Sequence, residues 1–330
     1  MSFMWIFVLF LPLAITGCSE TDSALNGKTI VLDPGHGGTA EVDHYRVGPS
    51  GEREEWINLR VALILQDLLL EEGAEVLMTR TDDSDVGLQE RAELAVDYDA
   101  DLFLSIHHNA IADTSVNFPV VYFHGNASEN RAGLQLGKIL GQKINSALFE
   151  GEKPVLVASD HTIFTGSGTA VLRHSYGIPG VITEASFFTN LNEEQRLQEE
   201  EYNRKEAEAL LEGIRDFFAA GPEMITDKHS KVELPPFPVL QAEGRMSPEV
   251  IGWKTAYEEA AVLIESDDSG DIEKALERAT ESAHLFPDSP LAMDAHTIRA
   301  RAFEKLGRDT EAETARKRIE EFYFMLPAMQ

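Results

Sequence analysis

The chain is poor in cysteine and in basic residues. Its 330 residues include one cysteine, which excludes a disulfide within the chain, and 28 Lys and Arg stand against 57 Asp and Glu. The net charge of −29 repels the phosphate backbone of nucleic acids and argues against a nucleic-acid partner. An apolar fraction of 43% and a charged fraction of 26% are ordinary for a globular protein, so we expect a folded chain.

Long apolar runs are also lacking, apart from one near residue 1. Residues 1–19 contain no charged side chain, and the apolar segment 3–15 is shorter than the roughly 20 residues that span a bilayer. Such a segment is typical of an export signal. It ends in Ile15-Thr16-Gly17-Cys18, which resembles the lipobox of bacterial lipoproteins, where the cysteine is acylated.

We therefore expect residues 1–18 to be a lipoprotein-type signal and Cys18 to carry a lipid anchor in a membrane. An uncleaved amino-terminal anchor is the alternative. Ser19 follows the cysteine, and by resemblance to Gram-negative lipoproteins this favours a periplasmic protein held at the outer membrane.

Residues 28–220 alternate between apolar segments of strand length and segments of helical periodicity. The first strand begins at Thr29 and ends in a glycine-rich turn. The later segments predict strands at 75–79, 102–106, 118–123 and 181–183, and helices at 54–72, 88–97, 132–148 and 202–218. This alternation predicts an α/β domain with a mostly parallel twisted sheet flanked by helices.

The remainder of the chain has a different composition. Residues 221–250 contain several prolines without clear periodicity, which is typical of a semi-rigid linker. Residues 251–330 predict a small all-α region, with alanines at helical spacing after Gly270 and Gly307. The spacing is close to the ~34-residue period of helical-hairpin repeats, and the helices resemble tetratricopeptide repeats that would offer a surface to a protein partner. A plain helical hairpin docked on the first domain is the alternative.

Histidine and carboxylate side chains occur where the predicted strands end. His36 and His107 each follow a buried strand, and Glu54 begins the first helix. In open α/β sheets the carboxyl ends of the strands form the ligand-binding edge. Two histidines and a glutamate are a known catalytic zinc set, and Glu184, after a further strand, could act as general base. By spacing alone the histidines could equally be caps, and Glu184 could equally pair with a core arginine.

Four segments of the chain occur in an order that resembles a known enzyme family. These are Val31-Leu32-Asp33-Pro34-Gly35-His36-Gly37-Gly38, Glu54-Glu55-Trp56-Ile57-Asn58-Leu59, Ser105-Ile106-His107-His108-Asn109-Ala110 and Thr183-Glu184-Ala185-Ser186-Phe187-Phe188-Thr189-Asn190. Together they resemble the signature blocks of the zinc-dependent N-acetylmuramoyl-L-alanine amidases, the type 3 amidase family. The resemblance covers about residues 28–219.

The resemblance implies a zinc ion held by His36, Glu54 and His107, with Glu184 as the catalytic carboxylate. It also implies hydrolysis of the amide between muramic acid and L-alanine in peptidoglycan, for cell-wall turnover or daughter-cell separation. Glu55 in place of Glu54, and His108 in place of His107, are alternative ligands.

Two other functions stay open on the sequence: a zinc peptidase acting on another wall peptide bond, and an inactive scaffold that binds the wall. The scaffold predicts loss of a ligand or of the base, whereas all four candidates are present. Beyond these four, Arg173 could meet a carboxylate of the stem peptide or form a structural ion pair. Asn109 could contact substrate or stabilise its loop, and Asp33 could orient a ligand or cap its turn.

Overall fold

The computed structural model describes residues 23–38 and 46–328. The predicted export signal and Cys18 lie outside these residues. Within the described ranges, no helix has both the length and the apolar character needed to cross a bilayer.

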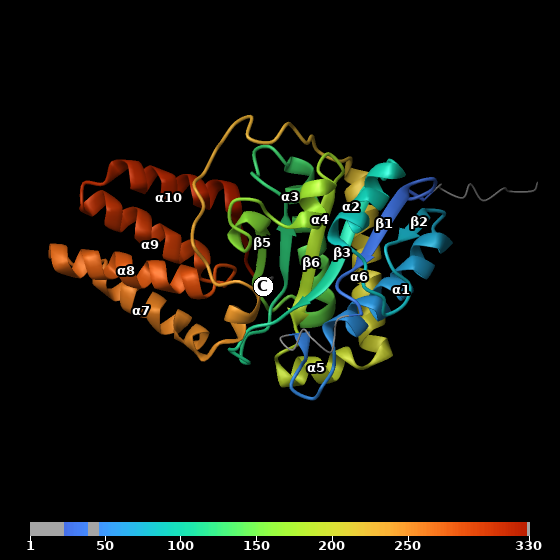
Figure 1. Ribbon diagram of the computed structural model, residues 1–330, viewed down its shortest axis with the longest axis horizontal. Helices are drawn as coiled ribbons and strands as arrows, with labels where there is room; N and C mark the ends of the chain where they lie inside the picture. Colours follow the sequence, from blue (N-terminus) through green and yellow to red (C-terminus); the bar gives the residue numbers. More distant parts are fainter. Residues whose placement is uncertain (1–22, 39–45, 329–330) are drawn as a thin grey trace, which may run out of the picture.

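A mixed sheet of seven strands organises the described part of the chain, in the order β2-β1-β3-β6-β4-β5-β7 (Figure 1). The strands are β1 (Thr29–Pro34), β2 (Glu75–Met78), β3 (Leu102–Asn109), β4 (Val120–Phe123), β5 (Val155–Ser159), β6 (Gly180–Phe187) and β7 (Tyr323–Leu326). β1, β2, β3 and β6 run parallel, β4 is antiparallel to β6, and β7 is antiparallel to β5. The predicted α/β fold with a mostly parallel sheet is confirmed.

Two strands extend beyond the ends expected from the sequence. β3 continues to Asn109 and β6 to Phe187, because their backbones stay paired, and His107 lies opposite Glu184 in the register. Both side chains are therefore held by the sheet itself. The strand β5 was not predicted from the sequence, although all five of its residues are buried and it pairs with β4 and β7.

Helices cover both faces of the sheet. Those between the strands are α1 (Glu54–Glu71), α2 (Leu88–Asp97), α3 (Arg131–Phe149), α4 (Ala170–His174), α5 (Leu191–Leu197) and α6 (Glu200–Ala220). On one face, Leu65 of α1, Leu140 of α3 and Leu210 of α6 belong to one buried core. On the other face, residues of α2 and α4 share a second core with Phe286, which lies far along the chain. The short helices α4 and α5 had no predicted counterpart.

The segment 221–250 contacts the α/β domain at several points. In segment 221–250, the backbone N–H of Thr226 donates to the Glu129 carbonyl at 2.8 Å, and the N–H of Ala112 donates to the Arg245 carbonyl at 3.0 Å. The segment ends in two short 3-10 helices, η3 (Ala242–Met246) and η4 (Pro248–Gly252). The segment 221–250 is therefore packed against the α/β domain.

Four helices then stack beside the sheet, on the left of Figure 1. They are α7 (Trp253–Leu263), α8 (Ser269–Leu285), α9 (Ala292–Lys305) and α10 (Asp309–Phe322), and each packs on the next. Small alanines such as Ala275 and Ala302 lie in the core between them. After α10 the chain returns to the sheet as β7, so this helical region and the α/β domain share one sheet.

We expect the free energy of unfolding to depend on this returning strand. Tyr323 is 4% exposed and packs in the same core as Phe286, so Tyr323→Ala should cost about 3–5 kcal/mol, the range for large aromatic residues. Tyr98→Ala is a matched control because Tyr98 is 60% exposed, and it should change stability by less than about 0.5 kcal/mol. Denaturant unfolding of both variants measures the difference. Equal stability of the two variants would contradict the packing of β7.

Candidate active site

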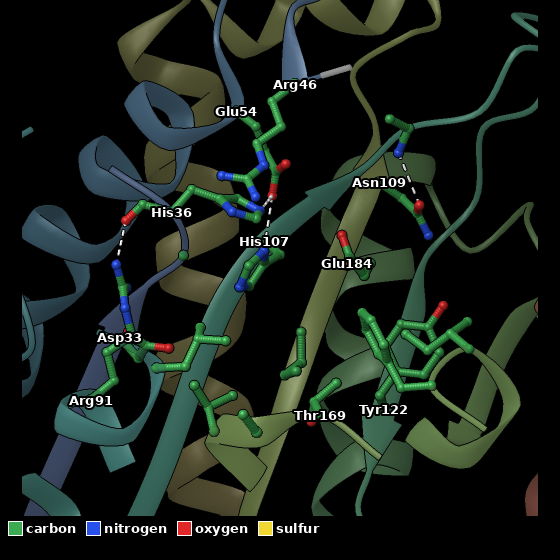
Figure 2. A pocket seen from close by; sticks show the side chains of 18 of the residues that line it. Asp33, His36, Arg46, Glu54, Arg91, His107, Asn109, Tyr122, Thr169 and Glu184 are labelled. Atoms are coloured by element: carbon green, nitrogen blue, oxygen red, sulfur yellow. Dashed lines mark hydrogen bonds and ion pairs between the residues drawn. The ribbon is translucent and has the colours of Figure 1, made fainter. Parts of the chain in front are cut away.

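A cavity of about 640 Å³ opens at the carboxyl ends of the central strands. Its lining includes His36 after β1, Glu54 at the start of α1, His107 on β3 and Glu184 on β6. Figure 2 shows these four side chains converging from neighbouring elements. The edge of the sheet that the sequence indicated is therefore the edge where the cavity lies.

The two histidines meet one oxygen of Glu54. Glu54 Oε1 lies 3.0 Å from His36 Nε2 and 2.9 Å from His107 Nδ1, and the two imidazole rings pack edge to face with centroids 4.6 Å apart. Ligand atoms about 2.0–2.1 Å from a tetrahedral zinc ion are roughly 3.3 Å from one another. The three donor atoms lie within 4.8 Å of one another, so two imidazoles and a carboxylate fit a zinc ion here.

The turn that carries His36 has an unusual backbone conformation. His36 has a φ of 61°, a left-handed conformation that is uncommon outside glycine and costs free energy. At Gly35, an added Cβ would lie 2.1 Å from the His107 ring. Any larger residue at position 35 would push the His107 ring away from Glu54, which explains the glycine before the histidine.

Two buried arginines, Arg91 and Arg80, stabilise this turn. Arg91 forms an ion pair with Asp33 at 2.8 Å, and Thr79 and Ser105 donate to the same carboxylate. Burial opposes ionisation of Asp33, but Arg91 and these donors lower the pKa of its carboxyl below the usual value. Arg80 donates to the carbonyls of Pro34 and Gly35. Asp33 therefore stabilises the turn through its ion pair with Arg91. Within the described residues, its carboxylate makes no hydrogen bond to the rings of His36 or His107.

The protonation states of His36 and Glu54 suit metal binding. Burial lowers the pKa of His36 to about 4, which keeps its ring neutral and able to donate a lone pair. Burial alone would raise the pKa of Glu54, but the two histidines beside it bring the pKa well below the usual value. The carboxylate is thus ionised and the His36 ring neutral at physiological pH.

Glu184 faces the same cavity without a hydrogen-bonding partner in the described residues. It is held on β6, opposite His107, and its Oε2 atom is buried and unpaired. Burial, together with the negative charge of Glu54, raises the pKa of Glu184 well above the usual value, and Arg245 opposes this shift. An unpaired buried carboxylate oxygen facing a cavity is suited to accept a proton from a bound water or substrate.

The two alternative ligands point elsewhere. His108 follows His107 on β3 and is buried on the other face, where its Nδ1 lies 3.0 Å from Asn58 Oδ1 and its Nε2 lies 3.0 Å from Glu206 Oε2. Glu55 is buried outside the cavity lining. Successive strand residues face opposite sides of a sheet. His108 is among the cavity-lining residues, but both of its ring nitrogens are engaged, so only His107 of the two places a ring nitrogen beside Glu54 Oε1.

A polar network from the end of the chain completes the cavity wall. Arg245 of η3 forms a bidentate ion pair with Asp288, which lies in the loop after α8. Its Nη1 and Nη2 atoms donate to the two carboxylate oxygens at 2.9 and 3.0 Å. Arg245 also donates to Asn109 Oδ1 at 3.1 Å, and the Tyr122 hydroxyl donates to Asp288. Asn109 is thereby tied to the C-terminal region. Sequence reasoning missed Arg245 and Asp288, because neither belongs to a recognisable motif.

A second group of metal-ligand side chains consists of His124, Asp160 and His161. The Asp160 carboxylate pairs with His124 Nδ1 at 2.9 Å and accepts from the backbone and the hydroxyl of Thr169, each at 2.8 Å. These contacts join the turn after β5 to the loop before α4. Hydrogen bonding therefore accounts for the group without an ion.

Comparison with known proteins places this site in a family. The family model for N-acetylmuramoyl-L-alanine amidase matches residues 30–216. The chain is 28% identical over 225 residues to the N-acetylmuramoyl-L-alanine amidase AmiA of Escherichia coli, covering 58% of this chain and 76% of that protein. It is 33% identical over 208 residues to the uncharacterised protein YqiI of Bacillus subtilis, covering 63% of this chain and 93% of YqiI.

A solved structure agrees with the sequence comparisons. The N-acetylmuramoyl-L-alanine amidase AmiC2 of Nostoc punctiforme superposes with a TM-score of 0.51 at 27% identity, over 59% of this chain and 99% of AmiC2. The matched segment contains all four candidate residues of the cavity, whereas Arg245 and Asp288 lie beyond it. The chain therefore belongs to the N-acetylmuramoyl-L-alanine amidase family and is an enzyme of that family, with a C-terminal region outside the family segment.

Proposed function

We propose that this amidase is zinc-dependent and hydrolyses the amide between N-acetylmuramic acid and L-alanine in peptidoglycan. The observation that carries the proposal is the convergence of His36, Glu54 and His107 on one point, with the unpaired Glu184 facing the same cavity. The presence of all four groups argues against an inactive scaffold.

The three ligands would hold the ion, which when bound lowers the pKa of a water ligand to about 7 and polarises a carbonyl. Glu184 would accept the proton of the attacking water and return it to the nitrogen of the scissile amide. Addition of water to the lactyl carbonyl and cleavage of the C–N bond then yield a muramic acid carboxylate and a free L-alanine amino group.

The cellular setting is part of the same proposal and rests on the sequence. An acylated Cys18 would anchor the enzyme to a membrane facing the periplasm, with the outer membrane favoured by Ser19. There it would act in wall turnover or daughter-cell separation. The stack of α7 to α10 would be available to a protein partner.

Analysis of products on purified wall fragments tests the bond assignment. We expect muramic acid with a free lactyl carboxylate and peptides with a new L-alanine amino terminus. New amino termini at any other residue would indicate a peptidase acting within the stem, and would contradict the proposal.

Removal of a ligand should abolish metal binding. In His107→Ala one imidazole of the group is lost, so we expect zinc affinity to fall by more than ~100-fold and activity with it. His174→Ala is the control, because His174 is exposed and lies outside the cavity lining. Metal analysis after dialysis against a weak chelator measures both. Retention of zinc by His107→Ala would rule out its assignment as a ligand.

Replacement of the proposed general base, Glu184, should leave zinc binding unchanged. Glu184→Gln keeps the shape of the side chain but cannot accept the proton, so we expect kcat to fall by about 10²–10⁴ while zinc content stays unchanged. Glu208→Gln, at an exposed position of α6, should keep the full rate. A Glu184→Gln variant with normal kcat would show that another group is the base.

A further inference from the structure

The arginines that line the cavity differ in whether a carboxylate neutralises them. Arg91 pairs with Asp33 at 2.8 Å, and Arg245 pairs with Asp288 at 2.9 Å. Arg173 also lines the cavity, yet no carboxylate oxygen of the described residues lies within ion-pair distance of it. The structural ion pair that the sequence left open for Arg173 is therefore not formed.

The guanidinium of Arg173 is nonetheless oriented. Its Nη1 donates to the carbonyls of Ser167 at 3.2 Å and Gly168 at 3.1 Å, in the loop that precedes α4. A second nitrogen, Nη2, lies 3.5 Å from His174 Nε2, so these contacts engage only part of a group that carries five N–H donors. The remaining donors of a partly buried, fixed guanidinium stay available for a ligand in the cavity.

A second cation lies beside Arg173. Lys228 Nζ donates to the Arg173 carbonyl at 2.9 Å and lies 4.6 Å from the centre of the Tyr176 ring. Like Arg173, Lys228 forms no ion pair within the described part of the chain. Burial lowers the pKa of Lys228 from its usual value; the charge of Asp160 opposes this shift, and the charge of Arg173 adds to it.

Two neighbouring basic residues that form no ion pair within the described residues are unexpected in a chain with a net charge of −29. Surface acids are abundant and would neutralise such a pair at little structural cost. The nearby acid Asp160 is fully buried and is occupied by His124 and Thr169. An anion bound from solution would relieve the repulsion between the two cations.

We propose that Arg173, which lines the cavity, binds a carboxylate of the substrate's peptide, and that Lys228, the second member of this basic pair, adds positive charge from beside it. This inference rests on the proposed function, because Arg173 lines the cavity that holds His36, Glu54, His107 and Glu184. A guanidinium matches the geometry of a carboxylate, and the ammonium adds charge. Lys228 lies beyond the family segment, so this half of the pair belongs to the chain's own C-terminal region.

Two synthetic substrates that differ only in charge test the proposal. They are N-acetylmuramoyl-L-alanyl-D-glutamate with both carboxyl groups free, and the same compound with both amidated. For Arg173→Gln in the zinc-loaded full chain we expect KM to rise about tenfold on the free acid, with kcat unchanged and less than twofold change on the diamide. Lys228→Gln should raise KM on the free acid about threefold, because an ammonium lacks the carboxylate-matching fork.

Conservative and remote variants complete the design. Arg173→Lys keeps the charge and should restore part of the affinity for the free acid, whereas Arg204→Gln, at an exposed position on α6, should leave both substrates unaffected. Binding of the two compounds to zinc-loaded Glu184→Gln, by calorimetry, measures recognition without turnover.

Equal effects of Arg173→Gln on the two compounds, or no effect on either, would overturn the carboxylate assignment. Failure of the unmodified enzyme to cleave either compound would instead contradict the proposed function. The two failures are therefore distinguishable in one set of measurements.

Discussion

The contact of Glu54 Oε1 with His36 Nε2 and His107 Nδ1, at 3.0 and 2.9 Å, is the interaction on which the site depends. It joins three elements: the turn after β1, the first residue of α1, and β3. Each partner is separately constrained, His36 by its left-handed backbone and His107 by its pairing in the sheet. The proposed zinc site would require donor atoms held within a few tenths of an ångström, and the strands and the buried start of α1 hold them in this way.

The rest of the candidate site follows from the register of β3 and β6. Because His107 lies opposite Glu184, the candidate ligand and the candidate base are held side by side by backbone hydrogen bonds. The Asp33–Arg91 ion pair then holds the adjoining turn, and both of its side chains are almost fully buried. A buried pair of this kind is costly to break from one side, so it also limits how far the turn can move.

The C-terminal region takes part in the site as well as in the fold. β7 extends the sheet, Phe286 enters the second core, and Arg245 with Asp288 holds Asn109 and Tyr122 in the cavity wall. A segment that the sequence indicated as a linker is thus packed beside the cavity. The shape and charge of the cavity consequently differ from what the family segment alone would form.

The sequence by itself determined the α/β class and most of the helices, and it predicted the four candidate site residues, because apolar periodicity and ordered motifs are local signals. It left open whether Glu54 or Glu55, and His107 or His108, would face the cavity. Only strand register and helix phase decided this, since adjacent residues point in different directions. Tertiary structure alone also brought Arg245 into the cavity lining, and Asp288 and Lys228 into contact with residues that line it, because pairing between segments far apart in the chain leaves no local pattern to read.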